Sequence, residues 1–189
     1  MQKDWQKAEK ILKGDGVVVL PTDTLYGITA NTFSKKAIKR IYKLKGRDDH
    51  KPFIVLISSY KDLGKFGVKV GGKEAKILGK FWPGKVSIIL PCPLKKFEYL
   101  HRGTNSIAFR MIGKKNKNLY ELINIVGPIV APSCNPEGLS PAKNISEAKV
   151  YFSHKSDLWP DLYINSGRKD VPPSKLLKYE NGEFVILRK

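Results

Sequence analysis

Residues 17–27 read Val-Val-Val-Leu-Pro-Thr-Asp-Thr-Leu-Tyr-Gly, and this stretch decides the fold. Its first four residues are apolar, which predicts a buried strand over 17–20. Beyond that strand Thr22, Thr24 and Tyr26 alternate at period two, so we expect their side chains to line one face where the strand ends. Ligands of open α/β sheets bind at such strand ends. The stretch therefore predicts a central strand and part of a binding site.

A helix and a second strand are expected next. Ser34 is placed to cap a helix whose apolar residues recur at helical spacing until Lys45-Gly46-Arg47. Residues 52–57, Pro-Phe-Ile-Val-Leu-Ile, have the composition of a buried strand. This order of elements favours a parallel pair of strands joined by a right-handed crossover. The cations Lys45 and Arg47, near the hydroxyls of the first stretch, indicate a site for a small, oxygen-rich anion.

The rest of the chain alternates helical and extended patterns. We expect further helices before Gly14 and over residues 73–81, 117–126 and 146–152. We expect further strands over residues 85–90, 106–111, 128–131, 161–165, 174–179 and 183–188. Asn181-Gly182 between the last two strands is a strong hairpin signal. Together these patterns predict one α/β domain over residues 1–189, with a twisted, mixed parallel and antiparallel sheet flanked by helices.

Composition narrows the class of protein. No apolar run approaches the ~20 residues that span a bilayer, and the first residues form an amphipathic pattern without a signal core. Cys92 and Cys134 are far apart, and His50, His101 and His154 lack metal-ligand spacing. We therefore expect a cytoplasmic protein with no membrane association, no disulfide framework and no metal held by its side chains.

The net charge of +18 suggests a polyanionic partner, most plausibly RNA. However, 29 of the 35 basic residues are Lys and only 6 are Arg, spread along the chain without a basic tail. A diffuse Lys excess also arises from general composition and solubility, so charge alone leaves nucleic-acid contact open. Because Arg is the preferred residue for bidentate phosphate binding, each of the few Arg residues is informative.

Two further segments resemble ligand-binding motifs. Residues 79–86, Gly-Lys-Phe-Trp-Pro-Gly-Lys-Val, nearly match a phosphate-binding P-loop, but the last position is Val and the segment runs from helix to strand. We interpret this segment as a helix stop and turn. The loop over 132–138 follows a predicted buried strand and carries Ser133 and Asn135. These two residues could bind a nucleotide or a carboxylate, or belong to an ordinary Asn/Pro/Gly turn.

Five motifs, taken together, carry a family resemblance. They are Pro21-Thr-Asp-Thr-Leu-Tyr-Gly27, Lys45-Gly-Arg47, Lys51-Pro-Phe53, Phe81-Trp-Pro-Gly84 and Ser133-Cys-Asn135. In this order and spacing they resemble the YrdC-like family of threonylcarbamoyl-AMP synthases, whose hallmark is Lys-x-Arg followed much later by Ser/Thr-x-Asn. The resemblance extends from about Gly14 to Arg188 and is to the short, single-domain form.

The chain departs from the family pattern at three places. Cys134 replaces the usual Ala, and Arg110-Met111-Ile112 lacks the Pro of the familiar Arg-x-Pro. Lys175 replaces the Thr of a common Pro-Ser-Thr, which removes one hydroxyl from the nucleotide pocket that the family would imply.

The resemblance implies a reaction. Members of the family convert L-threonine, bicarbonate and ATP into threonylcarbamoyl-AMP and pyrophosphate, normally with Mg²⁺. A separate threonylcarbamoyl transferase complex then modifies an adenosine of tRNA next to the anticodon. For this chain the resemblance implies a nucleotidyltransferase with ATP as a substrate and possible direct contact with tRNA.

The resemblance also implies roles for particular residues. Lys45 and Arg47 would be the catalytic cations that offset the repulsion between two anionic reactants. The threonine substrate would be held by Thr22, Thr24 and Tyr26. The nucleotide would be held by Lys51, Arg110, Ser133, Asn135 and Ser174. No side chain is an evident general base, and Asp23, which alternates away from the threonines, is expected to be structural.

Two rival functions stay open. The first is a noncatalytic protein on the same fold that binds tRNA or rRNA through its basic surface, with steep salt dependence and no ATP chemistry. The second is the handling of another carbamoyl adenylate, as in the related domain of hydrogenase-maturation carbamoyltransferases. The chain shows neither the zinc-finger nor the acylphosphatase-like segments of those proteins, which disfavours the second rival.

Overall fold

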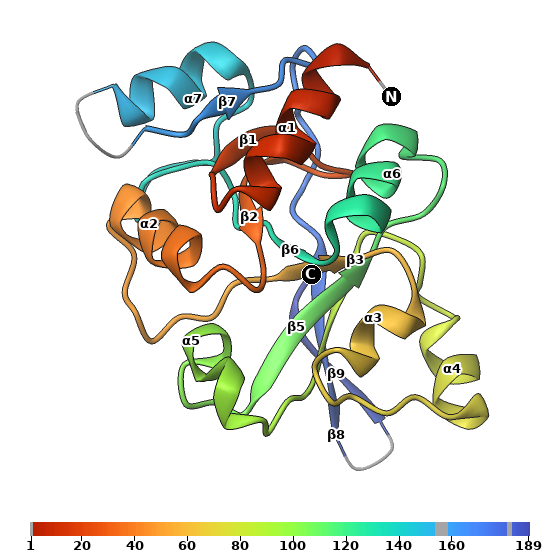
Figure 1. Cartoon of the computed structure of the whole chain (residues 1–189). Coiled ribbons are helices and arrows are strands. Elements are labelled where there is room, and N and C mark those ends of the chain that lie inside the picture. Colours follow the sequence, from red (N-terminus) through yellow and green to blue (C-terminus); the bar gives the residue numbers. More distant parts are fainter. Residues whose placement is uncertain (1, 154–158, 181–182) are drawn as a thin grey trace.

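A central sheet with helices on both faces is seen in the computed structural model, which describes residues 2–153, 159–180 and 183–189 (Figure 1). The described helices are α1 (Lys3–Lys13), α2 (Lys35–Lys45), α3 (Tyr60–Gly64), α4 (Gly72–Leu78), the 3-10 helix η1 (Lys95–Phe97), α5 (Glu98–His101), α6 (Lys117–Val126) and α7 (Ile145–Phe152). The described strands are β1 (Val18–Pro21), β2 (Tyr26–Asn31), β3 (Val55–Ile57), β4 (Val86–Pro91), β5 (Ser106–Met111), β6 (Ile129–Val130), β7 (Leu162–Tyr163), β8 (Lys175–Glu180) and β9 (Glu183–Arg188).

The described strands form one mixed sheet in the order β7-β1-β2-β6-β3-β5-β4-β8-β9. The pairs β1–β7, β3–β5 and β4–β8 are parallel. The other neighbours are antiparallel, including β8 and β9, as expected of a terminal hairpin. The predicted mixed sheet flanked by helices is therefore confirmed, whereas Asn181-Gly182 lies outside the described residues.

The expected parallel pairing of the strand over 17–20 with the strand over 52–57 is wrong. β1 turns through residues 22–25 into β2, which pairs with it antiparallel, and β2 and β6 separate β1 from β3. The turn closes because the backbone N–H and the hydroxyl of Thr22 both donate to the Leu25 carbonyl, at 3.1 and 2.7 Å. Such local bonds give the backbone an alternative to continuing as a strand.

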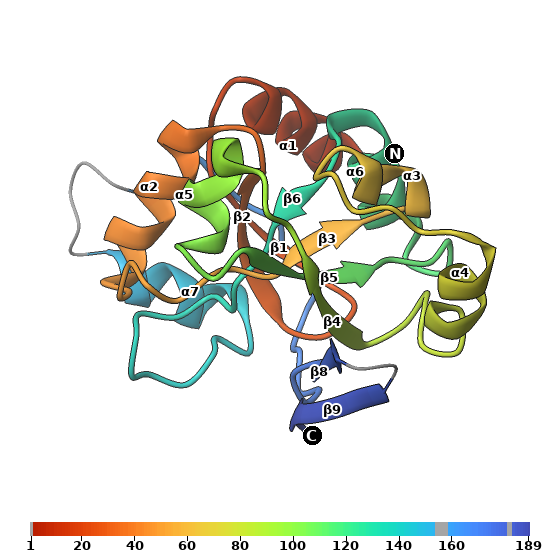
Figure 2. The ribbon, with the colours of Figure 1, turned by 90° about the horizontal axis from the view of Figure 1, so that it is seen from below.

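Alternate side chains of the sheet pack into two apolar layers. Val18 and Leu20 belong to a cluster that includes buried residues of α1 and α6, which lie side by side over one face (Figures 1 and 2). Val17 and Val19 belong to a second cluster with residues of α2 and α7. Because both faces are covered, every residue of β1 is buried, which explains its continuous apolar sequence.

The helix α2 brings the Lys-Gly-Arg motif to the edge of the loop over 132–138. Ser34 caps the helix as predicted, because its side chain accepts a hydrogen bond from the Ala37 N–H at 3.1 Å. Gly46 ends the helix in the left-handed conformation, with φ of 57°, which glycine adopts without steric cost. The chain consequently turns between Lys45, the last helical residue, and Arg47.

The P-loop-like segment is a connection between elements. Residues 79–86 join the end of α4 to the start of β4. A phosphate-binding P-loop leads instead from a strand into a helix, so the interpretation as a turn is confirmed. The buried Trp82 donates its indole N–H to the Val86 carbonyl at 2.8 Å, which fixes this turn against the sheet.

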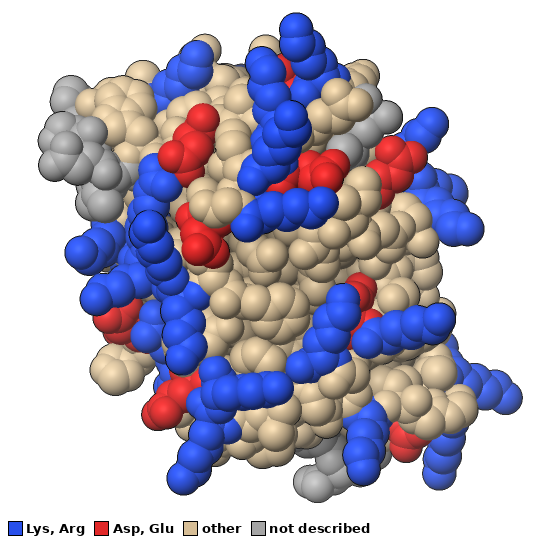
Figure 3. Space-filling model, viewed as in Figure 1, with Lys and Arg blue, Asp and Glu red and all other residues tan. Residues whose placement is uncertain are grey.

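Basic residues are spread over the face of the molecule that Figure 3 shows, without a single focus. Figure 3 shows Lys and Arg side chains across the whole visible face, with few acidic side chains among them. Among the described residues, no helix is long and apolar enough to cross a bilayer.

Candidate active site

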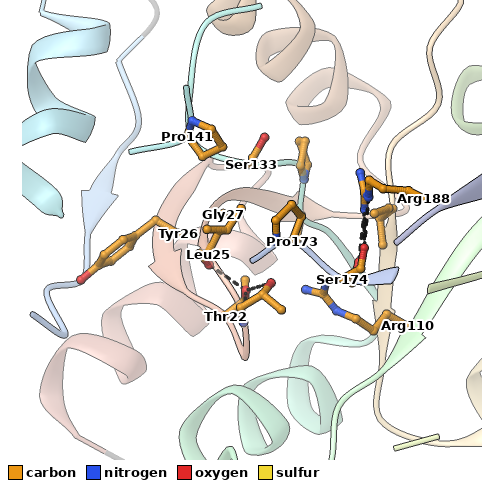
Figure 4. Close-up of a pocket in the computed structure, with 14 residues that line it drawn as sticks. Thr22, Leu25, Tyr26, Gly27, Arg110, Ser133, Pro141, Pro173, Ser174 and Arg188 are labelled. Carbon is orange, nitrogen blue, oxygen red and sulfur yellow. Dashed lines mark hydrogen bonds between the residues drawn. The ribbon is translucent and has the colours of Figure 1, made fainter. Parts of the chain in front are cut away.

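A cavity of about 200 Å³ lies beside the turn between β1 and β2 (Figure 4). The predicted site residues that line it are Thr22, Thr24, Tyr26, Arg110, Ser133 and Ser174. Arg188, at the end of β9, also lines the cavity. No described residue of its wall is acidic, so hydroxyls and guanidinium groups supply its polar side chains. This arrangement favours a small anionic ligand.

The two threonines belong to the tight turn. The Thr22 hydroxyl, besides donating to Leu25, accepts from the Thr24 N–H at 3.1 Å and lies 3.2 Å from the Thr24 hydroxyl. The expected strand face with period two is therefore wrong, although both residues line the cavity. Their mutual contacts hold the two hydroxyls in fixed positions before any ligand binds.

Tyr26 places its ring, but not its hydroxyl, at the cavity. The hydroxyl donates to the Gly167 carbonyl at 2.7 Å and accepts from the Ser166 N–H at 2.9 Å. In Figure 4 the phenol points away from Thr22 and Arg110. Burial raises the pKa of Tyr26, so the phenol stays protonated and continues to donate at neutral pH.

Arg110 and Asp23 form a buried ion pair. The guanidinium Nη2 of Arg110 lies 3.0 Å from Asp23 Oδ1, and the two side chains are only 4% and 6% exposed. Burial raises the pKa of Asp23, with Arg110 opposing the shift, and burial lowers the pKa of Arg110, with Asp23 opposing it. The structural role expected of Asp23 is thus the partial neutralisation of Arg110. Arg110 Nε, also buried, has no hydrogen-bond partner among the described residues.

Arg188 is a site residue that the sequence analysis missed. Its Nε and Nη2 donate to the Ser174 carbonyl at 3.1 and 2.9 Å, and Nη2 lies 3.3 Å from the Ser174 hydroxyl. That hydroxyl is also 2.9 Å from the Ser87 hydroxyl. The scarcity of Arg in a Lys-rich chain was the signal that could have identified Arg188.

Lys45 lies behind the cavity wall. Its side chain is almost completely buried, and its ammonium donates to the carbonyls of Ser133 and Asn135 at 2.6 and 2.5 Å. It also contacts Asn135 Oδ1 at 3.4 Å. Burial lowers the pKa of Lys45 to about 8. Ser133 thus lines the cavity while its carbonyl accepts a hydrogen bond from Lys45.

Asn135 acts within its own loop and does not line the cavity. Its amide nitrogen donates to the carbonyls of Pro136 and Leu139 at 2.9 and 2.7 Å. The neighbouring Cys134 is buried, and its N–H donates to the Tyr26 carbonyl at 2.9 Å. These bonds attach the loop to the start of β2.

Arg47 and Lys51 lie outside the cavity wall as well. Lys51 pairs with Glu137 at 2.5 Å, and Glu137 also accepts from the Asp48 N–H at 2.7 Å. Arg47 Nε donates to the Lys51 carbonyl at 3.2 Å, and its guanidinium lies 5.5 Å from the centre of the Phe53 ring. Arg47 keeps its terminal nitrogens without a hydrogen-bond partner among the described residues, so they are open to a ligand.

Protein side chains do not form a metal site in the described part of the chain. No group of three or more His, Cys, Asp or Glu residues there could hold a metal ion. His50 and His101 belong to no such group, and His154 lies outside the described residues.

The fold and the cavity define an α/β protein with a cationic, hydroxyl-lined pocket at the end of a hairpin. The Sua5/YciO/YrdC family model, whose description is telomere recombination, matches residues 10–189. The chain belongs to this family.

Curated relatives carry a common name. The chain is 36% identical over 140 residues to the threonylcarbamoyl-AMP synthase of Bacillus subtilis, which covers 72% of this chain and 40% of that protein. It is 27% identical over 181 residues to the threonylcarbamoyl-AMP synthase of Cellvibrio japonicus, covering 94% and 92%. The matches span 40% of the Bacillus subtilis protein and 36% of the Pyrococcus abyssi synthase.

Solved structures share the fold. The Sua5 protein of P. abyssi in complex with L-threonine superposes with a TM-score of 0.85 at 26% identity, covering 97% of this chain and 53% of that one. YciO of E. coli superposes with a TM-score of 0.83 at 21% identity, covering 100% and 90%.

Proposed function

We propose that this protein is a nucleotidyltransferase that makes threonylcarbamoyl-AMP and pyrophosphate from L-threonine, bicarbonate and ATP. The observation that carries the proposal is one cavity that combines two threonine hydroxyls with the guanidinium groups of Arg110 and Arg188 and has no acidic residue in its described wall. The names of the relatives and the threonine complex of a protein with this fold support the same activity.

The size of the cavity suggests how the substrates divide. At about 200 Å³ it is smaller than the roughly 300–1,000 Å³ typical of pockets for drug-sized ligands. We therefore assign the part of the cavity beside the β1–β2 turn to threonine, with the hydroxyls of Thr22 and Thr24 binding its polar groups and the Tyr26 ring forming a wall. A site that hydrogen-bonds a substrate hydroxyl rejects analogues that lack it, because its own polar groups are left unpaired.

The nucleotide is assigned to the other residues of the cavity wall. Ser133, Ser174, Arg110 and the newly identified Arg188 would hold the adenylate, and Asn135 would act by shaping the loop that carries Ser133. Lys51 already pairs with Glu137, so it would contribute to the nucleotide mainly by holding the same loop.

The proposed chemistry requires two anions to meet. The threonine amine and bicarbonate form an N-carboxylate with loss of water. A carboxylate oxygen then attacks the α-phosphorus of ATP, the bond from that phosphorus to the β-phosphate oxygen breaks, and pyrophosphate leaves. Arg47 would supply the cation that stabilises the developing phosphoryl charge, together with the ordered binding of both substrates. Mg²⁺ would enter as the counter-ion of ATP.

The product suggests the cellular context. A mixed carbamoyl–phosphate anhydride is unstable in water, so a transferase must consume it, and we propose that this is the complex that modifies tRNA next to the anticodon. The two buried free thiols fit the reducing cytoplasm.

The net charge of +18 favours a second candidate function, direct binding of tRNA or rRNA without catalysis.

Pyrophosphate release distinguishes these candidates. With ATP and Mg²⁺ present, we expect release that requires both bicarbonate and L-threonine and falls strongly when L-serine, valine or alanine replaces threonine. RNA binding with a steep salt dependence and no pyrophosphate release would instead favour the noncatalytic alternative.

Arg188 offers a specific test of the nucleotide assignment. Replacement by Met removes charge-assisted hydrogen bonds worth about 1.5–3 kcal/mol, so we expect the Kd for ATP to rise roughly ten- to hundredfold. Lys189→Met removes the same charge at the next, exposed position and should leave the Kd unchanged. Calorimetric titration with ATP measures both variants, and equal affinities in the two would contradict the role of Arg188.

A further inference from the structure

The ammonium of Lys45 is saturated by the loop over 133–137. Lys carries three N–H donors, and the structure provides three oxygen partners: the carbonyls of Ser133 and Asn135 and the side-chain oxygen of Asn135. The side chain is 2% exposed, so neither solvent nor the cavity reaches it. A substrate phosphate could approach this ammonium only if the loop moved away.

The same loop is held to the end of α2 by two more contacts. The Glu137 N–H donates to the Lys45 carbonyl at 2.7 Å, and the Glu137 carboxylate accepts from the Asp48 N–H at 2.7 Å. The backbone and the side chain of Lys45 thus both bind the loop. Since Ser133 lines the cavity, any shift at Lys45 changes the cavity wall.

We propose that Lys45 is a positioning residue whose buried ammonium fixes the loop over 133–137, and through it the Ser133 side chain, without touching the substrates. Lys45 thereby contributes to catalysis by holding Ser133 in position, and Arg47 is the cation that contacts the reactants. The kinetic part of this inference rests on the proposed function, whereas the structural part does not.

The charged groups around Lys45 define a pH dependence. Cys134, Arg47 and Glu137 face its ammonium, and burial raises the pKa of Cys134 to about 12, so the thiol stays neutral when Lys45 titrates. Because the pKa of Lys45 is lowered to about 8, its third donor and its charge are lost above that pH. Below pH 8 the buried cation of Lys45 lowers the free energy of unfolding. Deprotonation of Lys45 at higher pH therefore does not unfold the protein.

Hydrogen exchange in the ligand-free protein tests the positioning role. Lys45→Met keeps an unbranched side chain of similar length and removes all three donors. We expect amide exchange over residues 133–142 to accelerate at least tenfold, with the rest of the sheet unchanged. Lys39→Met, at an exposed position of the same helix, is the matched control and should exchange like the unmodified protein.

Kinetics separate positioning from direct contact. A displacement of about 1 Å near reacting groups can lower a rate ~10²-fold, so we expect Lys45→Met to lower kcat by up to that factor and to raise the Kd for ATP no more than Ser133→Ala does. The unmodified protein should lose activity with a midpoint near pH 8, and the variant should lack that limb. Unchanged exchange together with a large rise in the Kd for ATP would overturn the proposal in favour of direct contact.

A measurement on the unmodified protein covers the case in which Lys45→Met does not fold. NMR titration should show the Lys45 side chain and the carbonyl carbons of Ser133 and Asn135 shifting with one common midpoint. Independent midpoints would overturn the proposal. Unmodified protein that shows the coupled titration but no pyrophosphate release would contradict the proposed function and leave the positioning role intact.

Discussion

Replacing Arg110 with Ala is expected to lower the free energy of unfolding by about 3–5 kcal/mol, because it leaves the buried carboxylate of Asp23 without its partner. Removal of one member of a buried pair costs more than the pair itself contributes, since the remaining charge keeps its desolvation penalty. The loss should be visible in chemical denaturation at pH 7.

The pH dependence of this loss follows from Asp23. Burial already raises the pKa of Asp23 in the intact protein, and the loss of Arg110 raises it further. Protonation relieves the uncompensated charge, so the difference in unfolding free energy between the variant and the intact protein should shrink as the pH falls towards 4. A difference that is the same at pH 4 and pH 7 would contradict this explanation.

A double variant is the control for cavity effects. In Asp23→Asn with Arg110→Met the uncompensated charge is absent and most of the side-chain volume is kept. We expect it to recover most of the stability lost in Arg110→Ala. Failure to recover would mean that the uncompensated charge of Asp23 was not the main cause of the loss.

Replacing Arg47 with Ala is expected to lower kcat for pyrophosphate release by about 10²–10³, with the fold intact. Electrostatic donors aimed at developing charge have effects of this size when removed singly. Arg47 is the cation of its segment whose terminal nitrogens have no hydrogen-bond partner among the described residues, whereas Lys45 and Lys51 are both engaged.

Arg47→Lys is the matched variant, because it keeps the positive charge and loses the planar guanidinium group. An intermediate kcat is expected, since Lys cannot form two parallel hydrogen bonds to one phosphate. Steady-state pyrophosphate release and thermal melting should be measured together. Undiminished turnover of Arg47→Ala would show that this cation does not meet the reactants.

The sequence predicted helices and strands correctly wherever the local signals were strong and agreed with one another. The helix from Ser34 to Gly46 carried a cap, an apolar stripe and a left-handed stop, and the structure contains all three. The runs over 85–90 and 106–111 were apolar enough to be recognised as strands, and they correspond to β4 and β5.

Prediction failed where the structure is decided by hydrogen bonds between residues distant in the sequence, or by hydrogen bonds between side chains and the backbone. β2 carries Thr, Gly and Asn residues that are typical of a loop, yet pairing with β1 and β6 makes it a central strand. Spacing placed Thr22 and Thr24 on a strand face, whereas their own hydroxyls close a turn.

The candidate site shows the same contrast between residues that the sequence indicates and contacts that arise only on folding. The motifs of the family resemblance pointed to Arg110, Ser133 and Ser174, and these residues line one cavity. They could not reveal that Lys45 faces backbone carbonyls 88 to 90 positions away, or that Tyr26 binds Gly167, because those contacts arise only on folding.

The central claim is that one cavity joins threonine, bicarbonate and ATP, and mass spectrometry of the product tests it most directly. The purified protein would be incubated with ATP, Mg²⁺, L-threonine and ¹³C-bicarbonate, with L-serine and unlabelled bicarbonate as controls. We predict a threonylcarbamoyl adenylate that carries the ¹³C label, is formed with an equal amount of pyrophosphate, and is absent or much reduced with serine. Folded protein that binds ATP and threonine but forms no labelled adenylate would contradict the claim.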